Sequence, residues 1–499
     1  MNREKPANEE GRTRFRYLIT MGLLTTYSIG RFYINDYPFE LGENFLKYFE
    51  VTQKDVQFFC AIYSFPAIVL AVLSGPIVSK FGATKVCAVT GFIVFLSAFG
   101  YYLATVYKSF NVILAAQVLY GFSGEIFGVG QNTLFTQLFD DNGQTLAFGL
   151  SQSLNTLFET ISNFANPRIY EKTGSMSLAF MMGAIVGGIS AFCAFTWMSL
   201  QRLGWGSFKK EGKKVSVFEK GGEYEEELEG LEIMEKVKIW YKDVTDELVM
   251  LNILVTSIAQ YNFYQLMTYV TECMVKRFKL PLEDANHYVA LSLLLTIPCS
   301  QLYSCLAVGY GRKPDLLIFG CLSLQVYLAL FLYLPEQPSK SLMYFTSFLF
   351  SQFYSITYSI GYSCLGAITP ARSISMAYGL TSFLINLGFC LLPFVFGIFL
   401  EKDDPSGYDK ANYLMALFGV IGLGLAIRVK IVDARRGGVL GLPEVQRDPE
   451  ELGYEPTGGS GAVEDFDEFE DGGVEMVARN ELNLDVEKKV VDATEIDII

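Results

Sequence analysis

Between two apolar runs, each long enough to cross a bilayer as a helix of ~20 residues, the chain reads Gly75-Pro76-Ile77-Val78-Ser79-Lys80-Phe81-Gly82-Ala83-Thr84-Lys85. Gly75 and Gly82 permit a tight turn, and Lys80 and Lys85 suit a membrane surface, where their ammonium groups reach water. A second turn with a glycine and two cations, Gly311-Arg312-Lys313, follows in the other half of the chain. The two turns predict a membrane protein built from two related halves.

The relation between the halves extends beyond these turns. Shifting the chain so that Gly82 falls on Gly311 also places Lys47-Tyr48-Phe49-Glu50-Val51 on Lys276-Arg277-Phe278-Lys279-Leu280. Internal repeats with a long central linker are typical of secondary transporters. The fold class we expect is an all-α membrane protein, with twelve transmembrane helices in two pseudo-symmetric six-helix bundles.

The composition supports a membrane protein and excludes several other classes. Of the 499 residues 51% are hydrophobic and 18% charged, and the mean hydropathy is +0.30, whereas soluble domains carry about a quarter charged residues. The net charge of −14 leaves no basic surface for nucleic acid. No nucleotide-binding or catalytic signature occurs, so we expect neither an enzyme nor a cofactor.

Polar segments divide the chain into five parts. We expect a cytoplasmic N-terminal segment at 1–15, a bundle at 16–200, a cytoplasmic linker at 201–247, a second bundle at 248–431 and an acidic, disordered tail at 432–499. The first span is expected at 16–36, and an amphipathic linker helix is expected at 223–244, lying on the membrane surface. Lys and Arg gather in the loops on one side, which places both termini in the cytoplasm.

This layout resembles the major facilitator superfamily, whose corresponding loops carry G-x-x-x-D-x-x-G-R-K. Here Ser79 replaces the acid of the first loop, and the second loop, from Ser304 to Lys313, also lacks it. By this resemblance, the loop residues Gly75, Lys80, Gly82, Lys85, Gly311, Arg312 and Lys313 form the gating motif, without its charge relay.

Three segments are similar to one subgroup, the major facilitator superfamily domain-containing protein 1 group. They are Gly30-Arg31-Phe32-Tyr33-Ile34-Asn35-Asp36-Tyr37-Pro38, the run Gly121-Phe122-Ser123-Gly124-Glu125-Ile126-Phe127-Gly128-Val129-Gly130-Gln131-Asn132, and Pro370 with Ala377-Tyr378-Gly379 and Asn386-Leu387-Gly388. The group is similar to lysosomal dipeptide exporters, some with a single-pass glycosylated accessory protein. Gln117 and Thr156 stand where the resemblance implies arginines.

Charged residues inside the predicted spans are the first candidates for a binding site, because each is costly in a bilayer. They are Arg31, Glu125 and Glu159, with Asp36 at the edge of the first span. Polar residues that share a helix face with them, or line other predicted cavity helices, complete the candidate substrate-binding set: Asn132, Asn155, Gln260, Tyr261, Tyr264, Gln265, Tyr358 and Asn386.

These residues suit a zwitterion in a water-filled cavity between the halves. Arg31 would bind a carboxylate, and Glu125 or Asp36 an ammonium group. Structural alternatives remain for each: Arg31 extends to the outer surface, Glu125 pairs with Arg31, and Glu159 bonds a neighbouring helix.

The sequence thus predicts a secondary-active or facilitative transporter that moves a small polar solute across a lipid bilayer by alternating access. The solutes that we favour are dipeptides or amino-acid-like zwitterions. The rivals are a carrier of another organic ion or a sugar derivative, and a non-transporting receptor or scaffold that signals through the acidic tail. The resemblance implies a lysosomal or other endomembrane location, with the plasma membrane as the alternative.

Overall fold

A computed structural model describes residues 7–35, 37, 41, 43–51, 53–205, 233–400 and 405–441. The predicted site residue Asp36, the acidic residues from 442 onward and the first part of the helix expected at 223–244 lie outside these ranges. The remainder of that predicted helix is present as α11 (Ile233–Val244).

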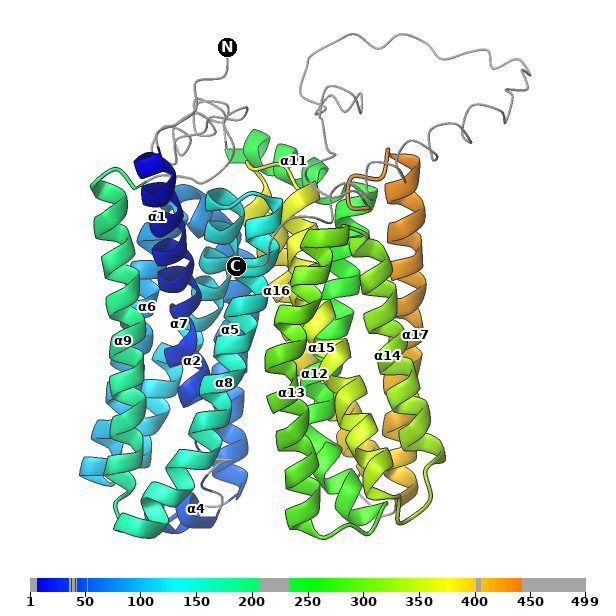
Figure 1. Ribbon diagram of the computed structural model, residues 1–499. Helices are drawn as coiled ribbons and strands as arrows, with labels where there is room; N and C mark the ends of the chain where they lie inside the picture. Colours follow the sequence, from blue (N-terminus) through cyan, green and yellow to red (C-terminus); the bar gives the residue numbers. More distant parts are fainter. Residues whose placement is uncertain are drawn as a thin grey trace, which may run out of the picture. The chain divides into compact units, whose positions relative to one another are not determined.

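The described chain before the linker forms one bundle of helices (Figure 1). Its elements are α1 (Ala7–Thr26), α2 (Ile29–Ile34), α4 (Glu43–Phe49), α5 (Gln53–Phe81), α6 (Ala83–Tyr107), α7 (Phe110–Leu138), α8 (Asp141–Thr173) and α9 (Met176–Arg202). We call this group the N bundle. Three aromatic residues lie together in one of its buried clusters: Tyr33 of α2, Tyr101 of α6 and Phe180 of α9.

The helices after α11 form the second group, which we call the C bundle (Figure 1). They are α12 (Glu247–Lys276), α13 (Leu282–Tyr310), α14 (Lys313–Tyr333), α15 (Lys340–Ile368), α16 (Ile374–Leu400) and α17 (Pro405–Arg435). With α1 and α2 taken as one interrupted span, the described residues contain twelve long helical segments, six in each bundle.

The first span is interrupted, whereas the sequence predicts one continuous helix at 16–36. The helix stops at Thr26 and resumes at Ile29. At the break, the Ser190 hydroxyl donates to the carbonyl of Tyr27, and the Ser28 hydroxyl donates to Asn155 Oδ1 at 2.7 Å. Backbone freed from a helix at membrane depth needs such partners from neighbouring helices. The break therefore depends on α8 and α9, which the local sequence does not reveal.

Gly30 should tolerate no side chain, because it lies directly against α9. A Cβ there would lie 2.8 Å from Gly187 Cα and 3.0 Å from Ser190 Cβ. Overpacking of this kind costs about 1–3 kcal/mol, so we expect Gly30→Ala to lower the melting temperature of the purified protein. Gly22→Ala on α1 is the control, since its Cβ would meet nothing within 4 Å. Equal melting temperatures for both variants would contradict this packing.

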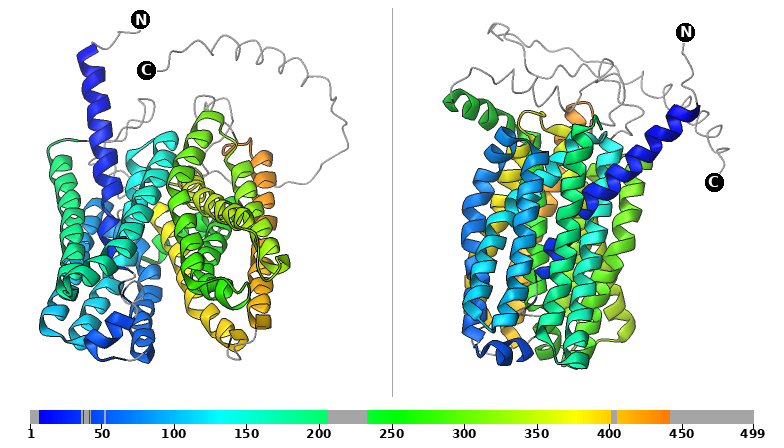
Figure 2. Two further views of the ribbon diagram at one scale, coloured as in Figure 1. Left: turned by 60° about the horizontal axis from the view of Figure 1, so that its bottom comes forward. Right: turned by 90° about the vertical axis from the view of Figure 1, so that its left-hand side faces the viewer.

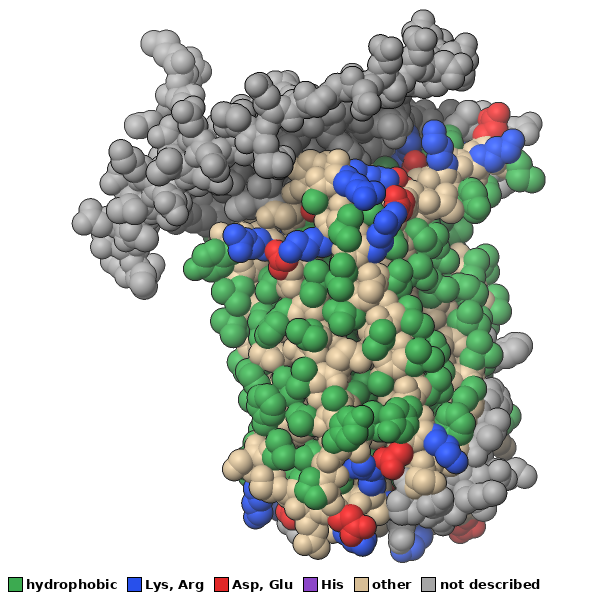
Figure 3. All heavy atoms as spheres, turned by 90° about the vertical axis from the view of Figure 1, so that its right-hand side faces the viewer, with side chains coloured by type: hydrophobic (Ala, Val, Ile, Leu, Met, Phe, Trp, Pro, Cys, Tyr) green, Lys and Arg blue, Asp and Glu red, His purple; other side chains and the backbone are tan. Residues whose placement is uncertain are grey.

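An apolar belt surrounds the helices between two charged ends. Figure 3 shows hydrophobic side chains along the height of one face, with Lys, Arg, Asp and Glu gathered above and below. Exposed apolar residues on that belt include Phe319 and Leu322 of α14 and Val420 of α17. By length and composition alone, seven helices of the described residues could cross a membrane: α6, α7, α9, α13, α14, α16 and α17. The protein is a multi-pass membrane protein.

A further long helix, α15, turns hydroxyl groups toward a neighbouring helix instead of toward lipid. Three serines of α15 form a ladder against backbone carbonyl groups of α13: Ser347 donates to Tyr288 at 3.0 Å, Ser351 to Ser292 at 2.6 Å and Ser355 to Thr296 at 3.2 Å. This ladder satisfies the hydroxyl groups within the C bundle. Ser351 and Ser355 therefore support the packing of α15 against α13.

The two bundles meet most extensively where α5 packs against α16 and α8 packs against α13, and α8–α15 and α7–α16 contacts add to this interface. Gly75 allows the first approach, because its Cβ would lie 2.9 Å from Met376 Cα. In the second, the Ser300 hydroxyl donates to the Gly149 carbonyl at 3.0 Å. We call the end that carries α11 and the α5–α6 and α13–α14 turns the linker end (Figures 1 and 2). These contacts lie between the middle of the bundles and the linker end.

Candidate functional site

A buried ion pair lies in the N bundle near the middle of the helices. Arg31 of α2 donates from Nη2 to Glu125 Oε1 of α7 at 2.9 Å. The guanidinium also donates to the Gly124 carbonyl at 2.7 Å and to the Tyr63 hydroxyl of α5 at 3.1 Å. The side chains of Arg31 and Glu125 are 20% and 10% exposed. Water screens such a pair far less than it screens a surface pair.

The glycines of α7 make room for this arginine. A Cβ on Gly124 would lie 3.3 Å from Arg31 Nε, and a Cβ on Gly128 would lie 3.2 Å from Nη1. The two glycines are four residues apart and therefore share one helix face. The absence of side chains at these two positions leaves room for the guanidinium beside its carboxylate.

Glu125 also joins the two bundles, because its second carboxylate oxygen faces α16. Oε2 accepts hydrogen bonds from the Ser382 hydroxyl and from Asn386 Nδ2, the latter at 3.0 Å. Oε1 accepts from Tyr63 at 2.9 Å in addition to Arg31. Donors of the N bundle thus bond Oε1 of Glu125, and donors of the C bundle bond Oε2. Any movement of the bundles apart at this level must break the bonds to Oε2.

Tyrosines of the C bundle face the same cluster. Tyr264 of α12 and Tyr358 of α15 lie within electrostatic range of Arg31, and Glu159 of α8 lies within range of Tyr264. Tyr264 also contacts Phe389 of α16, with ring centroids 4.6 Å apart. Of the predicted site residues, Arg31 and Asn386 contact Glu125 directly, at 2.9 and 3.0 Å.

Other predicted site residues lie elsewhere. Tyr261 packs inside the C bundle against Phe418, with centroids 5.2 Å apart. Asn155 accepts from Ser28 within the N bundle and supports the break in the first span. Gln260 and Gln265 are buried on α12, and Asn132 is half-buried on α7. Tyr261 and Asn155 thus make contacts within their own bundles, and their predicted role in substrate binding stays a prediction.

Sequence reasoning missed Tyr63 and Ser382. Tyr63 lies in α5 and its ring stacks on Tyr120, with centroids 5.2 Å apart. Ser382 lies one turn from Asn386 on α16. Their residue types gave little signal, because tyrosine and serine are common throughout this chain. Ser382 shares a helix face with the predicted Asn386, and that periodicity is the one clue that pointed to it.

One residue of the predicted gating motif, Lys313, makes contacts at the linker end that the loop motif did not suggest. Lys313, 1% exposed, donates from Nζ to Asp141 Oδ1 of α8 at 2.6 Å and to Ser363 Oγ of α15 at 3.1 Å. Both loops lack the acid of the family motif, yet Asp141 at the start of α8 supplies one from the other bundle. A carboxylate is also favoured there by the helix dipole. An ion pair thus connects the bundles despite the altered motif.

The remaining motif residues have simpler positions. Gly82 and Gly311 have φ of +81° and +66°, a region that glycine tolerates at tight turns. Arg312 follows with φ of +49°. Lys80 and Lys85 are exposed, and the Lys80 ammonium lies 5.4 Å from the ring centre of Phe81. These two lysines are placed at the surface of the linker end.

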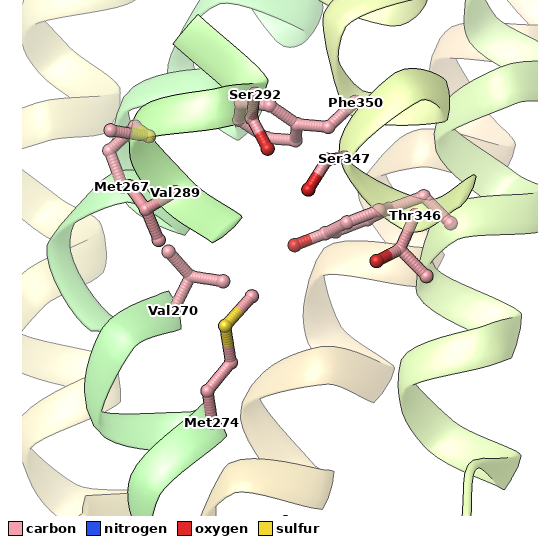
Figure 4. Close-up of a pocket in the computed structure, with 9 residues that line it drawn as sticks. Met267, Val270, Met274, Val289, Ser292, Thr346, Ser347 and Phe350 are labelled. Atoms are coloured by element: carbon pink, nitrogen blue, oxygen red, sulfur yellow. The ribbon is translucent and has the colours of Figure 1, made fainter. Parts of the chain in front are cut away.

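A small cavity lies inside the C bundle and is lined mainly by apolar side chains (Figure 4). Met267, Val270 and Met274 of α12 face Val289 of α13 and Phe350 of α15 across it. Its walls come from one bundle only, so it differs from the polar cavity that the sequence predicts between the halves. Around Arg31 and Glu125 the two bundles are closed, because Glu125 of the N bundle bonds Ser382 and Asn386 of the C bundle directly.

The chain matches the family model described as Major Facilitator Superfamily over residues 19–271 and 249–449. The lysosomal dipeptide transporter MFSD1 of Mus musculus is 20% identical over 449 residues, which cover 88% of this chain and 91% of that protein. The MFSD1 protein of Homo sapiens, also described as a lysosomal dipeptide transporter, is 20% identical over 453 residues, with 88% and 91% covered.

Solved transporters share the fold at low sequence identity. FucP in the outward conformation has a TM-score of 0.62 and 14% identity, covering 83% of this chain and 99% of FucP. The proton:xylose symporter XylE has a TM-score of 0.60 and 13% identity, covering 84% and 95%. These similarities concern the arrangement of the helices.

Proposed function

The chain belongs to the major facilitator superfamily, and on this premise we propose that it carries dipeptides or amino-acid-like zwitterions across a membrane. Membership in a transporter family favours this over the receptor or scaffold interpretation and over an enzyme. The observation that carries the proposal is the buried Arg31–Glu125 pair, which has one charge of each sign at the contact between the bundles.

The charge balance of this pair favours a zwitterionic solute. A zwitterion replaces the internal pair with two new ones, its carboxylate on Arg31 and its ammonium on Glu125, and leaves no buried charge without a partner. A monovalent anion would take Arg31 and leave Glu125 uncompensated. A neutral sugar would leave the internal pair in place and compete with it for donors. The likeness to dipeptide transporters supports the same choice.

The transport step in this proposal is an exchange of contacts at Glu125. When the ammonium group of the solute binds, Glu125 needs fewer donors from Ser382 and Asn386. The bundles then separate more readily toward the linker end, which we propose faces the cytoplasm because Lys and Arg gather in the loops on that side. Binding energy thereby shifts the balance between two conformations.

The location in the cell follows from the same likeness. We propose a lysosomal or other endomembrane location, because the relatives are described as lysosomal. An accessory membrane glycoprotein belongs to this proposal by resemblance alone.

Uptake by proteoliposomes tests the substrate class. We expect the purified protein to accumulate a free dipeptide, but not the same peptide acetylated at its N-terminus or amidated at its C-terminus, because each change removes one charge. Loss of a charge-assisted contact costs roughly 1.5–3 kcal/mol, or about tenfold to a hundredfold in apparent affinity. Uptake of organic acids or sugars in place of dipeptides would favour the rival carrier. Equal uptake of the blocked and free peptides would refute the assigned site.

A further inference from the structure

A short segment after α17 folds back onto the turn between α13 and α14. The helix ends at Arg435, and Gly437 and Gly438 follow with φ of +91° and +73°. Because glycine tolerates such values, the chain can reverse here within a few residues. Leu440, two residues after Gly438, is fully buried at 0% exposure. We call residues 436–441 the terminal strap.

The terminal strap is held by the side chain of Leu440 and by hydrogen bonds of its backbone. Leu440 packs in a buried cluster of the C bundle that includes Ala307 and Leu317, and its N–H donates to Asp433 Oδ1 at 3.0 Å. The carbonyl groups of Gly441 and Leu440 accept hydrogen bonds from the N–H groups of Arg312 and Lys313, at 3.0 and 3.3 Å. Such N–H groups at the start of a helix have no partner within it. The strap therefore caps α14.

Lys313 connects this cap to the other bundle. Its backbone N–H is bonded to the terminal strap, while its Nζ is bonded to Asp141 of the N bundle. A buried ammonium group is favourable only when its partners stay within hydrogen-bonding distance. The ion pair therefore needs the Lys313 backbone in one position, and the strap holds that backbone from the opposite side. Separation of the bundles at the linker end has to break the same pair.

We propose that the terminal strap is a positioning element for the gate at the linker end. With Leu440 inserted, Lys313 reaches Asp141 and the linker end stays closed. Release of Leu440 frees the start of α14, weakens the Lys313–Asp141 pair and shifts the conformational balance toward a state open at the linker end. Leu440 acts through Lys313 and contacts no solute in this mechanism. The inference concerns the gate and is independent of the solute that is carried.

Hydrogen–deuterium exchange of the full-length protein in lipid nanodiscs tests this without any substrate. In Leu440→Ala we expect exchange to rise at residues 141–150 of α8, in the opposite bundle, by about 2- to 30-fold, the range measured for coupling between separated sites. In Leu440→Met, exchange at residues 141–150 should stay as slow as in the unmodified protein, because methionine fills a volume similar to that of leucine. Lys430→Ala is the matched control, since it removes an exposed pair between α17 and Asp315 of α14.

The role of Lys313 is tested by a double-mutant cycle with Lys313→Gln. If the strap acts through Lys313, adding Leu440→Ala to that variant raises exchange at 141–150 no further. Two results would overturn the proposal: increased exchange confined to the strap and the α13–α14 turn, or an equal additional rise in the Lys313→Gln background. If Leu440→Ala fails to fold, Leu440→Val, a smaller truncation, is measured with the same two criteria. Failure of dipeptide uptake would leave this result unaffected.

Discussion

Glu125→Gln is expected to reduce dipeptide uptake by roughly a hundredfold, because it removes a charge that four side chains share. Both carboxylate oxygens accept hydrogen bonds, one from Arg31 and Tyr63 and the other from Ser382 and Asn386. Glutamine has nearly the same shape but replaces one acceptor with a donor. It also leaves Arg31 buried without an anion, and breaking a buried ion pair costs about 3–5 kcal/mol. Uptake of a labelled dipeptide by proteoliposomes measures the loss.

Two further variants separate loss of function from loss of folding. In the double variant Glu125→Gln with Arg31→Gln, neither buried charge remains, so we expect the melting temperature to recover while uptake stays low. Glu336→Gln is the matched surface control, because Glu336 pairs with Lys279 at an exposed site, where such pairs contribute little. Uptake by Glu125→Gln within twofold of the unmodified protein would show that Glu125 has no role in binding.

Arg31→Lys is expected to lower apparent affinity by about tenfold and to weaken discrimination against amidated peptides. The planar guanidinium bonds three groups at once, Gly124, Tyr63 and Glu125, and a lysine ammonium cannot match that fork. Because a charge-assisted bond is worth roughly 1.5–3 kcal/mol, the loss of one should appear in KM more than in the maximal rate. Arg31→Ala should remove the remaining preference for a free carboxylate.

Competition assays measure that preference directly. A free dipeptide and its C-terminal amide are compared as inhibitors of uptake, and the ratio of their inhibition constants should approach one in Arg31→Ala. Arg428→Lys is the control, since Arg428 forms an exposed pair with Glu247 and should leave the ratio unchanged. An unaltered ratio in Arg31→Ala would mean that another group recognises the carboxylate.

Much of the fold was predictable because membrane helices obey a simple physical limit. A bilayer requires runs of ~20 apolar residues with internally bonded backbone, and the runs in this chain meet that requirement. The paired turns at Gly82 and Gly311 predicted two related halves, in agreement with the two bundles of the structure. The break at Tyr27 and Ser28 was not predictable, because the groups that stabilise it come from α8 and α9.

The site was only partly predictable for a related reason. The cost of burying charge singled out Arg31 and Glu125, and helical periodicity grouped residues on shared faces. Periodicity does not say which face of another helix lies opposite. Tyr261 shares polar chemistry with Tyr264, one turn along α12, yet its ring packs against Phe418 of α17, whereas the Tyr264 ring packs against Phe389 of α16.

The sequence by itself determined that this chain crosses a membrane in two related sets of helices, because hydropathy and run length are local properties. Only the tertiary structure decided that Glu125 bonds both bundles, that Asp141 of the N bundle pairs with Lys313 of the C bundle and that the Leu440 carbonyl accepts from the Lys313 N–H. These contacts join residues far apart in the chain. Their energies depend on distance and burial, which exist only once the helices have packed.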